Sequence, residues 1–351
     1  MTFIPKPRVI HPALAKNKLG LTIRDYEGTM STLCAGCGHD SVTAGIIQAF
    51  HELDTEPHRV VKLSGIGCSS KTPTYFLGAA HGFNSAHGRM PTIATGANAA
   101  NRSLTYIGIS GDGDSLSIGM GQLSHAIRRN LNMLYVIENN GVYGLTKGQF
   151  SASADVGTKS KKGEANAYGP IDPAILALSL GATFVARSFS GDKKQLVPLL
   201  KAGLRHKGFA LVDVISPCVT FNDHEGSTKS YKYTRDRNVE ISHADFVPHA
   251  QEITAEVTPG GETHVTMHDG SIVRFTRVAE GYDPRHREKA MAYLMDHQKS
   301  GKVPTGLLFV DETAPEMHEI AGTVETPLNQ VPFEKLCPGN KTLAEIQDAF
   351  R

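Results

Sequence analysis

The chain has 351 residues, of which 40% are hydrophobic and 20% charged, so it can bury a sizeable core as one large domain or two modest ones. Its 36 basic and 35 acidic side chains leave a formal net charge of +1, which gives no electrostatic reason to expect binding to nucleic acid or to an anionic membrane. No run of 18 apolar residues occurs, and the N-terminus lacks the apolar core of a secretory signal, so we expect a cytoplasmic protein with no membrane partner.

Apolar runs alternate with helical stretches over the first two thirds of the chain. Residues 1–24 are interrupted by proline and charge and predict an N-terminal arm. Residues 25–221 predict one domain, an α/β fold with a mostly parallel sheet flanked by helices. The predicted strands are 59–64, 105–110, 132–137, 182–186 and 209–215, and the predicted helices lie near 40–52, 117–129, 172–180 and 192–206.

The pattern weakens afterwards, and residues 222–351 are expected to form a C-terminal extension. Residues 222–240 are polar and predict a surface loop, with a lid as the alternative. Three further elements are expected: a small antiparallel hairpin over 252–278 with a break at 258–261, a helix near 284–299 and a strand near 305–310.

A Gly-Asp-Gly-Asp turn, Gly111 to Asp114, directly follows one predicted strand, and Asn140 follows the next. A lone Gly-Asp-Gly is more often an ordinary turn. Here 25 residues, 114 to 138, separate Gly113 from Asn139, which is enough for one helix and one strand, so Asn140 returns beside Asp112. Mg²⁺ prefers oxygen ligands, and the Asp112 carboxylate, the Asn140 side chain and the Val142 carbonyl can supply three, while glycines let a diphosphate approach.

The chain has five cysteines, an odd number that is not typical of a disulfide framework. Cys34 and Cys37 form a Cys-x-x-Cys pair, and Cys68 and Cys218 each follow a predicted strand, at the same sheet edge as the turn. Cys337 lies far from the others and is expected to be a plain thiol. The spacing alone leaves open a structural zinc, an iron–sulfur cluster or unrelated thiols.

The stretch from Gly111-Asp-Gly-Asp114 to Glu138-Asn-Asn-Gly-Val-Tyr-Gly-Leu-Thr-Lys-Gly-Gln149 resembles the β subunit of 2-oxoacid:ferredoxin oxidoreductases, and the resemblance covers about residues 25 to 225. It implies thiamine diphosphate, Mg²⁺ and one [4Fe–4S] cluster held by the first four cysteines. The implied reaction is oxidative decarboxylation of 2-oxoglutarate with coenzyme A to succinyl-CoA and CO₂, with electrons leaving through the cluster to ferredoxin. The activating glutamate is expected in a partner α, or fused γα, subunit, which implies a hetero-oligomer.

The resemblance also assigns side chains around the cofactor. Lys147 would pair with the second carboxylate of 2-oxoglutarate, because pyruvate-preferring relatives tend to carry glycine there. Lys71 matches a lysine linked to coenzyme A, although a solvated lysine is the alternative, and His87 could instead be structural. The residues expected to contact the cofactor are Ile66, Gly67, Cys68, Ser69, His87, Gly111, Gly113, Asp114, Gly144, Leu145 and Thr146.

Other functions remain open at this point. The substrate could be pyruvate or a broad range of 2-oxoacids. A non-redox thiamine enzyme would explain the clamp, by which we mean the predicted Mg²⁺-diphosphate site of Asp112, Asn140 and Val142 with Gly111 and Gly113. It would leave the four cysteines without a role, and a zinc-stabilised, non-catalytic subunit would leave Asp112 and Asn140 without a role. The basic stretch from Lys159 to Lys162 is expected to be a solvated loop, with docking of ferredoxin or coenzyme A as a weaker idea.

Overall fold

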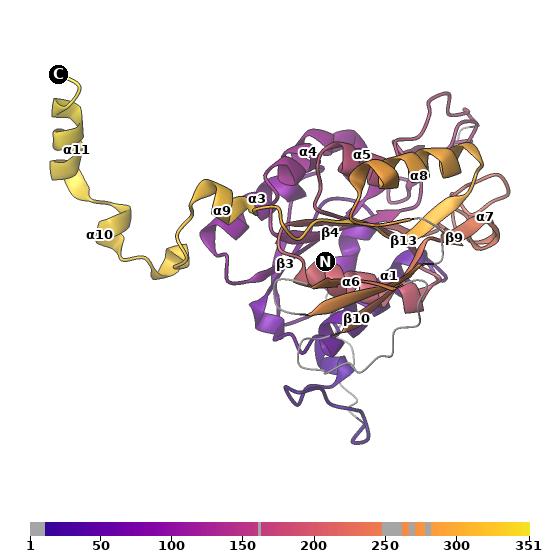
Figure 1. Cartoon of the computed structure of the whole chain (residues 1–351), viewed down its shortest axis with the longest axis horizontal. Helices are drawn as coiled ribbons and strands as arrows, with labels where there is room; N and C mark the ends of the chain where they lie inside the picture. Colours follow the sequence, from indigo (N-terminus) through magenta and orange to yellow (C-terminus); the bar gives the residue numbers. More distant parts are fainter. Residues whose placement is uncertain (1–10, 161–162, 248–261, 267–270, 278–281) are drawn as a thin grey trace.

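The computed structural model of the chain describes residues 11–160, 163–247, 262–266, 271–277 and 282–351. Its centre is an eight-stranded sheet in the order β2-β1-β3-β4-β8-β7-β13-β9 (Figure 1). Neighbouring strands are parallel throughout, except that β13 runs antiparallel to β7. The predicted mostly parallel α/β sheet is therefore confirmed.

The five strands predicted in the first two thirds of the chain are β1, β3, β4, β7 and β8. Every residue of β4 and β8 is buried, because helices cover both faces of the sheet, and both strands read as nearly continuous apolar runs. The strands of the sheet are β1 Val60–Ser64, β2 His81–Asn84, β3 Thr105–Gly111, β4 Met133–Asn139, β7 Phe184–Phe189, β8 Phe209–Ile215, β9 Asn238–Glu240 and β13 Val303–Val310.

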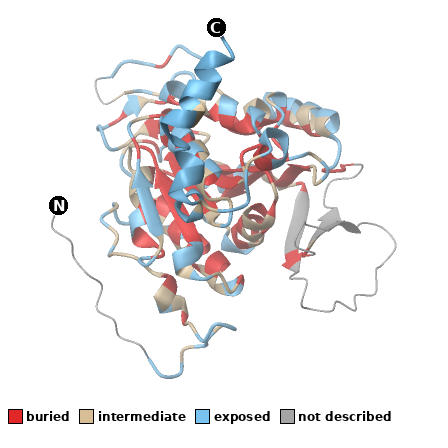
Figure 2. Ribbon diagram, turned by 90° about the vertical axis from the view of Figure 1, so that its left-hand side faces the viewer, coloured by how far each residue is buried: buried red, intermediate tan, exposed pale blue. Residues whose placement is uncertain are grey.

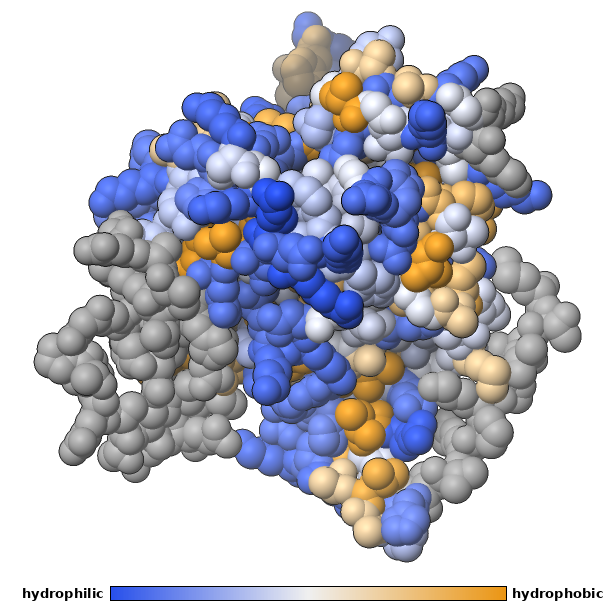
Figure 3. Space-filling model, turned by 90° about the vertical axis from the view of Figure 1, so that its right-hand side faces the viewer, coloured by the Kyte–Doolittle hydropathy of each residue, from blue (hydrophilic) through white to orange (hydrophobic). Residues whose placement is uncertain are grey.

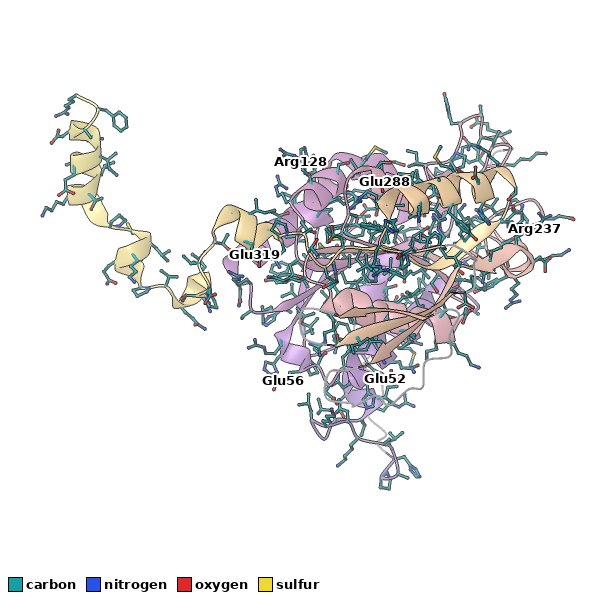
Figure 4. The ribbon with its side chains drawn as sticks, in the orientation of Figure 1. Glu52, Glu56, Arg128, Arg237, Glu288 and Glu319 are labelled. Atoms are coloured by element: carbon teal, nitrogen blue, oxygen red, sulfur yellow. The ribbon has the colours of Figure 1, made fainter. Side chains whose placement is uncertain are left out.

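Two layers of helices enclose this sheet (Figure 1). One core lies between the sheet and α1 Gly38–Glu52 with α6 Lys193–Arg205. The other core lies on the opposite face, under α3 Met90–Ala100, α4 Met120–Arg128, α5 Pro173–Ser179 and α8 Arg287–Lys299. Figure 2 shows the buried residues concentrated in these layers, whereas the exposed charged side chains labelled in Figure 4, among them Arg128 and Glu288, lie at the periphery.

The predicted helix at 117–129 begins later than expected. Residues Asp114–Ile118 form a π-helical turn, Gly119 follows, and α4 starts only at Met120. Such turns frequently occur at functional sites because they widen the backbone locally. The turn places Asp114 at the carboxyl end of β3, next to the predicted clamp.

Residues beyond 221 contribute to the main sheet, because β9 and β13 are two of its strands. The prediction of a loop over 222–240 was wrong in part: residues Tyr231–Arg237 form helix α7, which Ser230 caps by accepting a hydrogen bond from the Tyr233 N–H. Figure 3 shows that the face of the molecule away from the C-terminal tail, on the side of α7, is mostly hydrophilic.

The expected hairpin is part of a three-stranded antiparallel sheet, β10 Ser242–Val247, β12 Ile272–Arg277 and β11 Glu262–Thr266. The predicted break at 258–261 lies outside the described residues, as do residues 1–10 of the predicted arm. The remaining elements are α2 Thr72–Tyr75, β5 Val142–Tyr143, β6 Gln149–Phe150, α9 Met317–Ala321, α10 Phe333–Leu336 and α11 Gly339–Asp348. The last two helices extend away from the body (Figure 1). Among the described residues, no helix combines the length and apolarity that a membrane span needs.

Candidate functional site

A cavity opens at the carboxyl ends of β1, β3 and β4, where ligands bind in open parallel sheets. All of its lining residues except Tyr143 are among those that the sequence predicts for the cofactor and the metal. The lining residues are Ile66, Gly67, Cys68, Ser69, His87, Gly111, Asp112, Gly113, Asp114, Asn140, Val142, Tyr143, Gly144, Leu145 and Thr146. The structure therefore brings the predicted residues together.

Asp112 is 1% exposed and lies in a cluster of hydrogen-bond donors. Ser151 and Ser153 donate to its Oδ2, the latter over 2.6 Å, and the Asn140 N–H approaches Oδ1 at 3.4 Å. Burial raises the pKa of Asp112, while these hydrogen bonds act in the opposite direction. A buried carboxylate in this setting suits a bound cation. The two serines follow β6 and carry no sequence signal that would single them out.

Asp114, which lines the cavity, also holds neighbouring segments in place. Its Oδ1 accepts hydrogen bonds from His87 Nδ1 and, over 2.7 Å, from the Gly88 N–H, and its Oδ2 accepts from Ser110 over 2.6 Å. A Cβ atom at Gly65 would lie 1.8 Å from Oδ2, so only glycine fits there. Asp114 thus fixes the segment after β1 and the His87 ring at the rim of the cavity.

Two of the four predicted cluster cysteines, Cys68 and Cys218, face a glycine that lines the cavity. A Cβ atom at Gly144 would lie 3.4 Å from Cys68 Sγ and 3.6 Å from Cys218 Sγ, so both sulfurs face this glycine. The Gly38 N–H donates to Pro217 O over 3.2 Å, which holds the Cys34–Cys37 loop beside the segment of Cys218.

All five cysteines are free thiols, and Cys37, Cys68 and Cys218 are partly shielded from solvent. Burial raises the pKa of Cys37 to about 12 and also raises that of Cys68, and the nearby Cys218 contributes to both increases. Cys34 is exposed, and Thr220 Oγ1 lies 3.6 Å from its sulfur. Cys337 is exposed near the end of the chain, in the segment that extends from the body, as expected for a cysteine outside the site.

Helix α7, in a segment predicted to be a loop, lies against the loop of Cys34 and Cys37. The Tyr231 hydroxyl donates to Gly36 O over 3.0 Å, and its ring packs edge-on against Phe189. Burial raises the pKa of Tyr231, and Cys37 adds to this effect. Residues 222–240 are polar, and their sequence gave no signal for this contact.

Two lysines predicted at the site do not line the cavity. Lys147 is exposed, follows the lining residue Thr146, and has a left-handed backbone with φ of 79°. Lys71 is partly buried, and its N–H donates to Cys68 O over 3.1 Å. Tyr143, which was not predicted, donates from its hydroxyl to Gly113 O over 2.9 Å and excludes any side chain at that glycine.

A buried ionic cluster lies behind the clamp. Arg187 is bonded to Asp172 at 2.5 Å and to Asp213 at 2.7 Å, and Asn139 donates to Asp213 over 3.0 Å. The Ser153 hydroxyl oxygen also lies 2.8 Å from Asn139 Oδ1, which links this cluster to Asp112. A second cavity, of about 240 Å³, borders Arg187. The Arg187 charge holds the pKa of Asp172 below its usual range despite burial.

Comparisons with known proteins define the class of this domain. Residues 65–214 match the family model described as thiamine pyrophosphate enzyme, C-terminal TPP binding domain. The fold and the cavity therefore define a thiamine-diphosphate-binding domain, with the matched segment running from the start of the loop after β1 to near the end of β8.

Curated relatives narrow the class. The chain is 45% identical over 199 residues to the 2-oxoacid:ferredoxin oxidoreductase subunit beta of Saccharolobus solfataricus, covering 56% of this chain and 65% of that one. It is 39% identical over 213 residues to the 2-oxoglutarate oxidoreductase subunit KorB of Mycobacterium tuberculosis, covering 60% and 57%. The chain thus spans less than two thirds of these two relatives.

A third relative is matched over most of its length. The chain is 32% identical over 235 residues to the 2-oxoglutarate synthase subunit KorB of Methanocaldococcus jannaschii, covering 65% of this chain and 85% of that one. A solved structure, 2-oxoglutarate:ferredoxin oxidoreductase from Magnetococcus marinus with 2-oxoglutarate, coenzyme A and succinyl-CoA bound, is 30% identical with a TM-score of 0.71, covering 89% and 91%. The chain belongs to the family of 2-oxoacid:ferredoxin oxidoreductase β subunits, which confirms the resemblance seen in the sequence.

Proposed function

We propose that the chain is the β half of an enzyme that oxidatively decarboxylates 2-oxoglutarate with coenzyme A, yielding succinyl-CoA and CO₂ and passing electrons through a [4Fe–4S] cluster to ferredoxin. One observation carries this proposal: the predicted clamp residues and Cys68 line the same cavity, and Cys218 faces Gly144, another of its lining residues. An electron released in the cavity therefore has an acceptor site next to it.

The residues at the clamp fit thiamine diphosphate and Mg²⁺. Asp112 and Asn140 offer side-chain oxygens, and Val142 offers a backbone carbonyl, which are hard ligands suited to this ion. Gly111 and Gly113 flank Asp112 at the end of β3, and both line the cavity. When bound, thiamine diphosphate supplies a carbanion that attacks 2-oxo groups, and the protein contributes binding and orientation.

The four thiols fit an iron–sulfur cluster better than zinc. Within the described parts of the chain, no three His, Cys, Asp or Glu side chains converge tightly enough to hold a single metal ion. A four-iron cluster is wider than one ion, so its thiolate ligands stand farther apart. Cys34, Cys37, Cys68 and Cys218 are accordingly proposed as its ligands, and electron transfer as their role.

The substrate proposal rests on Lys147 and on the relatives. An exposed ammonium directly beyond Thr146 can pair with the second carboxylate of 2-oxoglutarate at the mouth of the cavity. Two of the relatives above are named for 2-oxoglutarate, and the Magnetococcus marinus structure contains 2-oxoglutarate, coenzyme A and succinyl-CoA. We assign coenzyme A contact to Lys71 on the resemblance alone.

The partner is proposed to be an α subunit that carries the activating glutamate. Glu138 is fully buried and accepts hydrogen bonds from Thr72, so it does not face the cavity as a replacement. The relatives' names as β subunits imply an α partner subunit, and we assign the glutamate to it on the resemblance. We therefore expect the isolated chain to be inactive toward 2-oxoacids.

The proposal is tested by anaerobic co-expression with the α subunit, followed by iron and sulfide analysis of cysteine variants. Cys68→Ser and Cys218→Ser should lose most of the iron and sulfide, whereas Cys337→Ser, in the exposed tail, should keep the wild-type content. Zinc without iron in the wild-type complex would overturn the electron-transfer function. Full 2-oxoglutarate oxidation by the isolated chain would overturn the half-site.

A further inference from the structure

Four buried side chains meet beneath the cysteine segments, and we call them the His39 hub: His39, Thr72, Glu138 and Ser216. Each is at most 1% exposed. They come from four separate segments that converge only in the folded chain. His39 lies two residues after Cys37 at the start of α1, Thr72 begins α2 four residues after Cys68, Ser216 lies between β8 and Cys218, and Glu138 precedes Asn140 in β4.

The hub is held together by hydrogen bonds between its members. His39 Nδ1 lies 2.6 Å from Ser216 Oγ and 3.5 Å from Glu138 Oε2. The Thr72 hydroxyl donates to both carboxylate oxygens of Glu138 at 3.0 Å. Because every cysteine segment supplies one member, the position of the His39 ring depends on all of them.

The other side of the His39 ring faces the metal clamp. Asn140 Nδ2 lies 3.4 Å from His39 Nε2, and the Val142 N–H donates to Asn140 Oδ1 over 3.0 Å. An amide nitrogen donates, so Nε2 is the acceptor and the ring proton is on Nδ1, toward Ser216 and Glu138. With its nitrogen held by His39, Asn140 turns its oxygen toward the backbone of Val142, the other predicted metal ligand on this segment.

Resting on the function proposed above, we infer that His39 is a positioning residue that couples the cluster site to the thiamine-diphosphate site. Mutation of a group that orients a metal ligand typically lowers metal affinity by about 10- to 100-fold. Here the orienting ring is fixed by the segments that carry the cysteines. Binding of thiamine diphosphate and Mg²⁺ at the clamp therefore changes the midpoint potential of the cluster. The coupling is reciprocal, so the state of the cluster also changes the affinity for the cofactor.

The test uses the full-length chain in complex with its α subunit, purified anaerobically without added thiamine diphosphate. The midpoint potential of the cluster is measured by an EPR-monitored redox titration, with and without thiamine diphosphate and Mg²⁺, and the affinity for thiamine diphosphate is measured by calorimetry. In the wild type, the cofactor should shift the potential. In His39→Leu, the iron content should persist, the shift should disappear and the affinity should fall by about 10- to 100-fold.

His51→Leu is the matched control, because it makes the same change at the other end of α1. His51 Nε2 has no hydrogen-bond partner among the described residues, so this variant should keep the wild-type shift and affinity. If His39→Leu does not accumulate as a folded complex, Ser216→Ala decides, since it removes only the hydroxyl at Nδ1 and should shrink the shift.

The outcomes separate this inference from the proposed function. A wild-type complex without iron, or one that does not bind thiamine diphosphate, overturns the proposed function. A complex that holds both cofactors but shows no shift overturns the coupling alone. A wild-type shift and affinity in His39→Leu, or a full shift in Ser216→Ala when the first variant fails to fold, also overturns the role of His39.

Discussion

The Ser153 hydroxyl donates to Asp112 Oδ2 over 2.6 Å, in a buried contact that joins residues 41 positions apart in the chain. Its oxygen is also within 2.8 Å of Asn139, the residue before the predicted metal ligand Asn140. The carboxylate of the clamp is thus oriented by a loop that follows the small β5–β6 hairpin. This relationship makes the serine a measurable part of the metal site.

Ser153→Ala should weaken binding of thiamine diphosphate and Mg²⁺ by about 10-fold, because a hydrogen bond to a charged group contributes about 1.5–3 kcal/mol. Isothermal titration calorimetry of the anaerobic complex measures the effect. Ser179→Ala is the control, since that hydroxyl is exposed and bonds only to its own helix, at Ile175 O. Equal affinities for the two variants would show that Ser153 does not support the clamp.

Lys147→Gly should lower the preference for 2-oxoglutarate over pyruvate, measured as the ratio of kcat/KM values. The expected decrease is about 10-fold or more, corresponding to a charged contact of about 1.5–3 kcal/mol. Glycine suits the left-handed backbone at this position, where φ is 79°, so folding should not suffer. Lys147→Arg keeps the positive charge and should retain most of the preference. An unchanged ratio in Lys147→Gly would contradict the assignment.

Arg187→Leu should destabilise the chain by about 3–5 kcal/mol, because it leaves Asp172 and Asp213 buried without their cation. Urea unfolding, followed by circular dichroism, measures the change. Arg285→Leu provides the comparison, since Arg285 pairs with Asp283 at 2.9 Å but its side chain is 56% exposed, and it should cost less than about 1 kcal/mol. Similar losses in both variants would mean that burial does not increase the contribution of the Arg187 ion pairs to the free energy of unfolding.

Lys62 should make the stability depend on pH in the alkaline range. Its ammonium donates to Phe76 O and Leu77 O inside the fold, and burial lowers its pKa from 10.5 to about 8. Between these values the unfolded chain binds a proton that the folded chain has released, so the free energy of unfolding rises with pH, by at most about 3 kcal/mol. The contribution is complete above 10.5 and is lost as the pH falls through 8.

This pH effect is measured as the difference in urea midpoint between about pH 7.5 and about pH 9.5, in the wild type and in Lys62→Met. The variant has no titrating group at this position, so its midpoint should rise less over the same interval. A rise of equal size in both proteins would assign the effect to other groups.

Much of the fold follows from local pattern. The apolar runs of β4 and β8 mark strands buried on both faces, and the residues at their carboxyl ends, such as Asn140, fall at one edge because the strands are parallel. The antiparallel placement of β13 beside β7 depends on packing between distant segments, which no local period records. Helix α7 was not predicted because it has only seven residues and most of them are polar.

The site shows the same division. The motif residues at Gly111–Asp114 and the cysteines were predicted and gather around one region, although their roles remain predictions. The groups that orient them were not predicted: Ser153 approaches Asp112 only through a loop, and His39 meets Ser216 from 177 positions away. Single histidines and serines carry no spacing signal, so their contacts emerge only from the folded chain.

The central claim, that clamp and cluster form one electron-releasing site, is tested most directly by EPR spectroscopy of the anaerobic complex with its α subunit after addition of 2-oxoglutarate. The account predicts the signal of a reduced [4Fe–4S] cluster or of a substrate radical, dependent on thiamine diphosphate and lost in Asp112→Asn. A complex that consumes 2-oxoglutarate while its EPR spectrum stays unchanged, or that contains no iron, would contradict it.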